Sequence, residues 1–161
     1  MKYHLQILRK YLSLDTTPQD IAKNLILKTC EIEEVIERQI PRSIVIGKIE
    51  QVEKHPDADK LNICQVNCWT QGKFQIICGG TNVAEGLFVA TALVGTPFPE
   101  AGITIAKRAM RGVDSEGMIC SKGELGINED KDTHWIRDLA QDLEVSDTDL
   151  GRPLSEVFPR L

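Results

Sequence analysis

The chain has 161 residues, of which 42% are hydrophobic, 5% aromatic and 27% charged, and its net charge is −5 at pH 7. This length fits one domain, or one domain with an appendage, and the hydrophobic share is enough for a packed core. No apolar run approaches the roughly 20 residues that span a bilayer, and the N-terminus lacks the long apolar core of a signal peptide, so we expect no membrane contact and a cytoplasmic location.

Residues 1–40 predict the N-terminal part of a small α/β module. An amphipathic pattern over residues 1–12 indicates a short helix. Thr17 and Pro18 then form a helix-start signal, a capping threonine followed by proline at the first helical position, and apolar residues recur at helical spacing as far as Ile26. Alternation over residues 30–36 indicates a strand. Two helices and one strand are too few to form a stable core by themselves, so this part needs a partner surface or further chain to pack against.

Residues 41–141 predict a small β-barrel. Strands are expected over residues 44–52, 61–68, 74–78, 88–94, 103–111 and 118–120. Residues 81–86 look like one helical turn ended by glycine, residues 95–102 are expected to be loops, and residues 121–126 a short helix or tight turn. Short strands separated by glycine and proline turns are typical of an oligonucleotide-binding (OB) barrel. The predicted class is mainly β with flanking helices (α+β).

Residues 142–161 predict an acidic connector followed by a return segment. Residues 142–149 are acidic and weakly patterned, and an apolar pattern resumes over residues 150–158. We expect Leu154 and Phe158 to pack on the N-terminal module, beside the helix that contains Ile21 and Leu25, because neither apolar pattern is complete alone.

The block His55-Pro56-Asp57-Ala58-Asp59-Lys60-Leu61 predicts a rigid turn between the first two strands of the barrel. Asp and Pro favour turns, and the two carboxylates can accept backbone N–H groups. The turn would aim His55 and Lys60 at the rim that meets nucleic acid in OB folds. Lys60 and His55 are candidate RNA-binding residues, and the imidazole of His55 is either a hydrogen-bonded scaffold group, which we favour, or a base. The alternative is that the block is only a turn.

The segment from Lys107 to Met118 holds the most basic cluster of the chain, with three cations in five residues. In an extended segment Lys107 and Arg111 share one face and could grip one phosphate backbone together. Ser115 could donate to a phosphate or cap a turn. Asn82 could cap the short helical turn, with an RNA contact as a secondary role. A solvated loop of mixed charge is the alternative for the basic cluster.

No constellation for catalysis or metal binding is visible in the sequence. The five cysteines are scattered without a Cys-x-x-Cys pair, so reduced and mostly buried thiols are expected rather than a metal site. Asp57 and Asp59 lack the further oxygen ligands of a calcium loop. No phosphate-cradling glycine-rich loop occurs. The segment 44–125 carries 8 basic and 9 acidic residues, so it cannot bind RNA strongly by charge alone.

Three blocks in order, HPDADKL, IICGGTNVAEG and MRGVDSEGMICS, resemble the tRNA-binding OB domain of aminoacyl-tRNA synthetases. The flank LSLDTTPQDIAKNLILKTCEIEEV makes the chain most similar to the N-terminal part of the bacterial phenylalanyl-tRNA synthetase β subunit family, in which a small module brackets the barrel. One departure is Gly80-Thr81, where the family commonly has Ala-Pro. The family's β subunit is also several-fold longer.

The resemblance implies a function in tRNA binding or subunit architecture within an ATP-dependent phenylalanine–tRNA ligase. It implies tRNA-Phe and a catalytic α subunit in an α2β2 assembly as partners. ATP and Mg²⁺ would serve the parent enzyme, and no cofactor and no catalytic residue are assigned to this chain. Two alternatives remain open, a free-standing homodimeric tRNA-binding protein and a purely structural assembly domain.

Overall fold

The computed structural model describes residues 16–28, 32, 40–121, 123–125, 135–142 and 145–157. By their contacts the residues fall into two compact units, one containing helix α2 and the other spanning residues 40–159. The expected division into residues 1–40, 41–141 and 142–161 stays a prediction. None of the helices in the described residues is long and apolar enough to cross a membrane.

Helix α2 (Pro18–Lys28) begins as the sequence predicts. The Thr17 hydroxyl accepts the N–H of Asp20 at 3.1 Å and donates to the Asp20 carboxylate at 2.7 Å. The cap therefore satisfies one of the free N–H groups of the first turn. Ile21 and Ala22 are buried, whereas Ile26 is 53% exposed and departs from the expected apolar face. The helix expected in residues 1–12 lies outside the described residues, as does most of the strand expected in residues 30–36.

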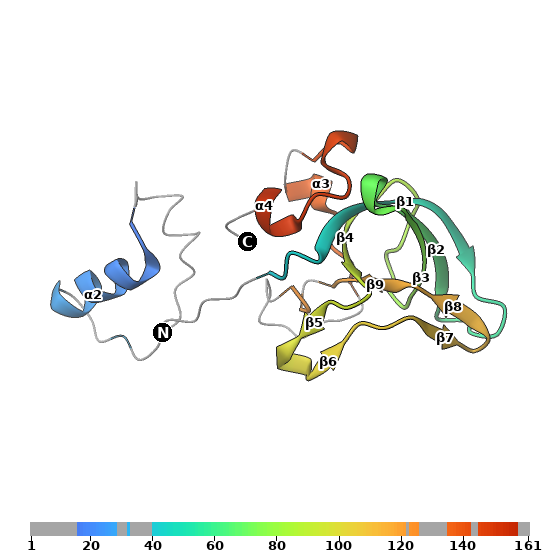
Figure 1. Ribbon diagram of the computed structural model, residues 1–161, viewed down its shortest axis with the longest axis horizontal. Coiled ribbons are helices and arrows are strands. Elements are labelled where there is room, and N and C mark those ends of the chain that lie inside the picture. Colours follow the sequence, from blue (N-terminus) through green and yellow to red (C-terminus); the bar gives the residue numbers. More distant parts are fainter. Residues whose placement is uncertain are drawn as a thin grey trace. The chain divides into compact units, whose positions relative to one another are not determined.

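The larger unit is mostly β, built on a five-stranded antiparallel sheet in the order β3-β2-β1-β4-β9 (Figure 1). Its strands are β1 (Ile44–Lys54), β2 (Asn62–Asn67), β3 (Lys73–Cys78), β4 (Phe88–Leu93) and β9 (Gly117–Ile119). The sheet nearly closes into a barrel because β3 also contacts β9, and the N–H of Glu116 donates to the carbonyl of Gln75 at 2.8 Å. These strands confirm the predicted ones to within one or two residues at most ends.

Two small hairpins form separate two-stranded sheets. Strands β5 (Pro97–Phe98) and β6 (Ile103–Thr104) flank the short 3-10 helix η2 (Pro99–Ala101), and β7 (Arg108–Met110) pairs with β8 (Val113–Ser115). The prediction of one continuous strand over residues 103–111, preceded only by loops, is therefore wrong. The chain makes a strand pair on each side of residues 105–107 instead.

Strand β1 is buried on both faces at its start. Its first half pairs with β4 and its second half with β2, with a register shift between Ile49 and Gln51. Ile44, Val45, Ile46 and Gly47 are all buried, so the alternation expected of a half-buried strand is absent here. A Cβ on Gly47 would lie 2.5 Å from the Thr91 hydroxyl and 2.6 Å from a methyl group of Val66, so the side chains packed around this position leave room only for glycine.

Residues 151–153 bind the edge of β1 that β4 leaves free at the start of the strand. The N–H of Ile46 donates to the carbonyl of Arg152 at 3.0 Å, and the N–H of Gly151 donates to the carbonyl of Ile46 at 2.8 Å. Leu154, in helix α4 (Leu154–Val157), is fully buried, and α4 contacts β1. The expected packing of this segment on the N-terminal module stays a prediction, and Phe158 lies outside the described residues.

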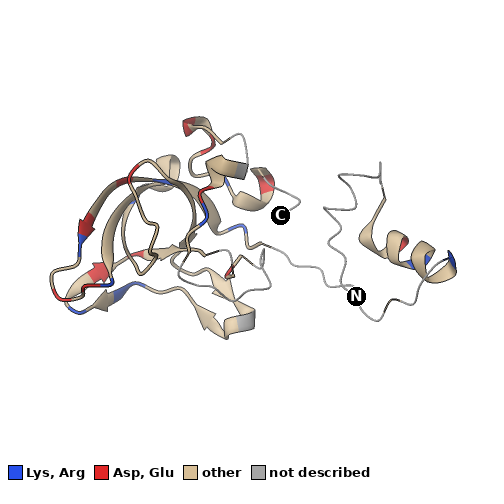
Figure 2. Ribbon diagram, turned by 180° about the vertical axis from the view of Figure 1, so that it is seen from behind, with Lys and Arg blue, Asp and Glu red and all other residues tan. Residues whose placement is uncertain are grey.

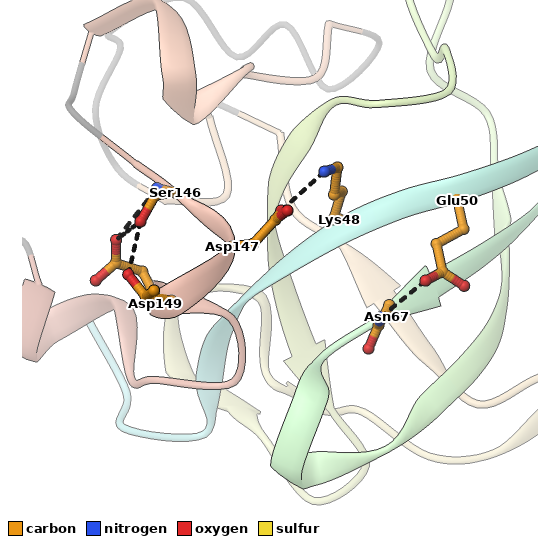
Figure 3. A network of polar contacts seen from close by, with 7 residues as sticks. Lys48, Glu50, Asn67, Ser146, Asp147 and Asp149 are labelled. Carbon is orange, nitrogen blue, oxygen red and sulfur yellow. Dashed lines mark hydrogen bonds and ion pairs between the residues drawn. The ribbon is translucent and has the colours of Figure 1, made fainter.

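The acidic connector is more ordered than predicted. After helix α3 (Leu139–Asp142), the 3-10 helix η3 (Asp147–Asp149) is closed by a capping box in which Ser146 and Asp149 bind each other's backbone N–H groups (Figure 3). Asp147 also forms an ion pair with Lys48 of β1 at 2.8 Å. Ser146, Asp147 and Thr148 are exposed, as a solvated connector predicts, but the sequence analysis did not anticipate the 3-10 helix and its cap.

The barrel interior holds four reduced cysteines, as expected: Cys64, Cys68, Cys78 and Cys120. Burial raises the pKa of Cys64 to about 12 and that of Cys68 to about 11, and it raises the pKa values of the other two thiols as well. A thiol in an apolar interior stays protonated and behaves as a small apolar side chain. Cys30 lies outside the described residues.

Candidate nucleic-acid interface

The basic cluster lies on a tight hairpin. Arg111 and Gly112 form the two-residue loop between β7 and β8, with φ values of +48° and +86°. Positive φ at both loop positions matches the twist of the two strands. The chain therefore turns at Arg111, and the prediction that Lys107 and Arg111 lie on one face of one extended segment is wrong.

This hairpin is bound to the turn between β1 and β2. The Nε2 of His55 lies 3.0 Å from the carbonyl oxygen of Met110, and its Nδ1 accepts the N–H of Asp57 at 3.1 Å. A neutral imidazole with its proton on Nε2 satisfies both contacts. Arg111 adds a third link, since its Nη1 donates to the carbonyl of Asp57 at 2.6 Å. We call residues 54–61 and 107–116 together the turn–hairpin end.

The predicted turn at residues 55–61 is confirmed, but its internal support differs from the expectation. His55 is only 4% exposed, and its ring supplies the acceptor that was expected from Asp57 and Asp59. A buried side chain with both ring nitrogens engaged is a scaffold residue. This is the first of the two roles that the sequence left open.

Ser115 and Asn82 also hold backbone segments together. The buried Ser115 hydroxyl accepts the N–H of Ile77 at 3.1 Å and donates to the carbonyl of Gly117 at 3.2 Å, which ties β8 to β3. The Asn82 amide donates to the carbonyl of Ile136 at 2.6 Å and accepts its N–H at 2.8 Å. Residues 81–86 form turns rather than a helical turn, so the predicted cap at Asn82 is wrong.

The cations of the turn–hairpin end differ in how far they are already paired. Lys107 forms ion pairs with Glu116 at 2.8 Å and with Asp114 at 3.3 Å, and the hydrogen bond to Glu116 is the main cause of its raised pKa. Lys60 is exposed, as are Lys54 and Arg108, which the sequence analysis did not single out. Within the described part of the chain, no ion pair involves these last three side chains.

Five cations and four carboxylates share this end of the molecule. Figure 2 shows blue and red segments together on the turn and the hairpin, with the cations on the first half of the hairpin and the carboxylates on the second. The surface is therefore not a basic patch, and a phosphate would have to compete with Asp114 and Glu116 for Lys107. Such a surface favours weak contacts that salt readily disrupts.

The outer face of the sheet carries a separate network of polar side chains. Asn67 of β2 donates to Glu50 of β1 at 2.8 Å, and Lys73 of β3 binds the other oxygen of Glu50 at 2.6 Å. The Lys48 ammonium also lies 5.1 Å from the ring centre of Phe88. Figure 3 shows the labelled part of this network beside η3. The described residues contain no group of three or more His, Cys, Asp or Glu side chains placed to hold a metal ion.

Comparisons with known proteins identify the family of the chain. The family model described as "Putative tRNA binding domain" matches residues 44–147. The phenylalanine–tRNA ligase beta subunit of Synechococcus sp. strain JA-2-3B'a(2-13) is 39% identical over 100% of this chain and 19% of its own length. That of Shouchella clausii is 44% identical over 75% of this chain and 15% of its own length.

The C-terminal domain of Plasmodium vivax p43 matches with a TM-score of 0.38 and 25% identity, covering 47% of this chain and 43% of its own. The chain spans about a fifth of the length of the first Synechococcus relative. The family model covers well over half of the chain and the whole five-stranded sheet. The chain therefore belongs to the tRNA-binding domain family and is similar over its length to phenylalanine–tRNA ligase beta subunits.

Proposed function

We propose that this chain is the N-terminal, tRNA-binding part of a phenylalanine–tRNA ligase β subunit, and that its barrel is an OB fold. Its turn–hairpin end contacts tRNA phosphates through Lys60, Lys107 and Arg111. The observation that carries the proposal is the junction made by His55 and Arg111, which fixes two loops far apart in sequence into one exposed, cation-bearing surface. Preorganised loops lose less entropy when they bind.

Three of the predicted site residues support this surface from within. His55 fixes the turn against the hairpin, Ser115 ties the hairpin to β3, and Asn82 holds the segment at Ile136. Their polar groups are already hydrogen-bonded inside the unit. We assign them positioning roles, with the RNA contacts made by the exposed cations, including Lys54 and Arg108.

The parent reaction is the ATP-dependent attachment of phenylalanine to tRNA-Phe in the cytoplasm. The partner is the catalytic α subunit in an α2β2 assembly, and ATP with Mg²⁺ acts there. The chain matches only about a fifth of the length of the first relative. We therefore assign the catalytic functions of such an enzyme to segments other than this one.

The test is a salt series of tRNA-Phe binding measured by mobility shift. The Lys107→Ala/Arg111→Ala variant should bind more weakly and flatten the dependence of log affinity on log salt by roughly one to two units. The matched control is Arg42→Ala/Arg152→Ala, which removes the same charge from exposed positions near the start of β1. The control should keep the wild-type slope.

Equal slopes in both variants would contradict the proposed surface. The near balance of charges at the turn–hairpin end would then favour the assembly role, in which the barrel contacts protein rather than RNA. A free-standing homodimer would instead give the wild-type chain a dimer mass in solution without the α subunit.

A further inference from the structure

Trp69 is the most exposed aromatic residue among the described residues of the larger unit, and its backbone is strained. It opens the 3-10 helix η1 (Trp69–Gln71) in the loop between β2 and β3, the short bright-green helix in Figure 1. Its exposed fraction is 67% and its φ is +48°. A bulky side chain rarely adopts positive φ, because its Cβ crowds the backbone, and such residues concentrate at functional sites.

The loop holds Trp69 firmly in this conformation. The N–H of Trp69 donates to the side-chain oxygen of Asn67 at 2.8 Å, and the N–H of Gly72 donates to the carbonyl of Trp69 at 3.0 Å. The loop is closed at its base by a bond from the N–H of Cys68 to the carbonyl of Gly72 at 2.9 Å. Gly151 packs so closely behind it that a Cβ there would lie 2.4 Å from the Cys68 carbonyl oxygen. The indole is therefore presented on a fixed support.

The surroundings of Trp69 are polar and include an exposed cation. Asn67 links it to Glu50, and Glu50 binds Lys73, whose side chain is 64% exposed. Within the larger unit, the other large, exposed apolar side chains of the described residues lie around β4 to β7 and before α3: Val94, Ile103, Met110 and Trp135. A lone indole among hydrogen-bonding groups is not an apolar patch of the kind that protein partners cover.

We propose that Trp69 is a stacking platform for an unpaired RNA base, and that Lys73 binds the phosphate next to that base. The inference rests on the proposed tRNA binding and adds a second contact area, outside the turn–hairpin end. An indole stacks on any base, because every base has a π face, and the contact is not ionic. Lys73 exchanges Glu50 for phosphate when RNA binds.

The experiment uses the fact that the chain has only two tryptophans. In a Trp135→Phe variant all tryptophan fluorescence comes from Trp69. Titration with a short unpaired oligouridylate, and separately with a tRNA-Phe transcript, should quench this emission. The quenching should saturate over the same concentrations as an independent mobility shift.

The matched variant is Trp69→Asn, because asparagine tolerates positive φ and keeps the loop. Its thermal midpoint should equal or exceed that of the wild type. Its affinity for the oligouridylate should fall on the order of 5- to 150-fold, the range expected for one lost stacked base, with an unchanged salt slope. Trp69→Phe should retain most of the affinity, since it keeps an aromatic face.

Two results would overturn the inference while leaving the proposed function intact. One is a clear mobility shift of wild-type protein without quenching of Trp69, and the other is wild-type affinity in Trp69→Asn. A Trp69→Asn variant that binds RNA normally but loses the α subunit would assign the indole to a protein contact. Absence of any shift with wild-type protein would reject the proposed function, and the inference would fail with it.

Discussion

The imidazole of His55 serves two loops at once. One ring nitrogen contacts the β7–β8 hairpin at Met110 and the other holds the turn at Asp57. This buried side chain and the guanidinium of Arg111 together join the two loops of the turn–hairpin end. Lys60, in the same turn, is exposed, and among the described residues its side chain makes no hydrogen bond or ion pair that joins the two loops.

Replacing His55 by Ala should destabilise the protein. The Met110 carbonyl and the Asp57 N–H would lose their partners, at a cost of about 1–3 kcal/mol in the free energy of unfolding. Urea denaturation measures this loss. Lys60→Ala is the control, because a substitution at an exposed site should change the free energy by no more than about 0.5 kcal/mol. Similar values for the two variants would show that the imidazole does not hold the junction.

The positions of strands and turns could be predicted from short stretches of the sequence, whereas contacts between distant residues could not. The strands around Ile46 and Val66 follow from apolar alternation, and the turn after His55 follows from its Pro and Asp residues. The contact of His55 with Met110 joins residues 55 apart, and no local pattern signals it. The turn at Arg111 was missed because arginine is not a residue that predicts positive φ.

The 3-10 helix η3 is a different kind of omission, because its signal was present. Ser146 followed three residues later by Asp149 has the spacing of a capping box, with Asp in place of the usual Glu or Gln. The segment was interpreted as a connector because it is acidic and has few apolar residues, so the capping-box spacing was not used. Trp69 was equally visible as an aromatic residue in a hairpin loop, but its exposure and its φ depend on the fold.

Removing the Asp149 carboxylate should loosen residues 145–157 from β1. This side chain accepts hydrogen bonds from Ser146 and binds Arg152 at 2.8 Å, and the backbone bond from Ser146 is the main cause of its lowered pKa. Loss of such a cap costs about 1 kcal/mol. In Asp149→Ala, the amides of Ile46 and Gly151 should exchange hydrogen roughly fivefold faster, because local opening becomes easier.

The control for this variant is Asp147→Ala, which breaks a half-exposed ion pair with Lys48 and should alter exchange much less. A pKa lowered by folding stabilises the folded state above the ordinary value of 3.8, and the benefit disappears as the pH falls through the folded-state value. Wild-type exchange at Ile46 should therefore approach that of Asp149→Ala in acid. Equal exchange rates in the two proteins at neutral pH would contradict the role of the cap.

For the whole molecule, the buried thiols make stability sensitive to alkali. Unfolded thiols titrate near 9.0, whereas burial raises the pKa of Cys64 to about 12 and that of Cys68 to about 11. The unfolded state therefore loses protons first. The stabilisation is complete below pH 9 and declines as the pH rises toward 11, by at most about 1.4 kcal/mol per pH unit for each thiol.

Urea unfolding at a series of pH values from neutral to alkaline measures this decline. The Cys64→Ala/Cys68→Ala variant should be less stable at neutral pH, because it leaves small cavities, but its free energy of unfolding should fall less steeply above pH 9. The slope is the relevant readout, since the cavities lower stability equally at every pH. Parallel curves for the two proteins would mean that these thiols do not carry the effect.

The pairing of Val45 with Pro153 brings the entry and the exit of the barrel unit side by side. Residues 44–153 therefore leave from and return to neighbouring points once the barrel unit has folded. The entropy of bringing these two points together is lost in the folding of the unit itself. Any chain attached at Val45 and at Pro153 consequently starts from one place on the surface of the unit, whatever the length of the barrel between them.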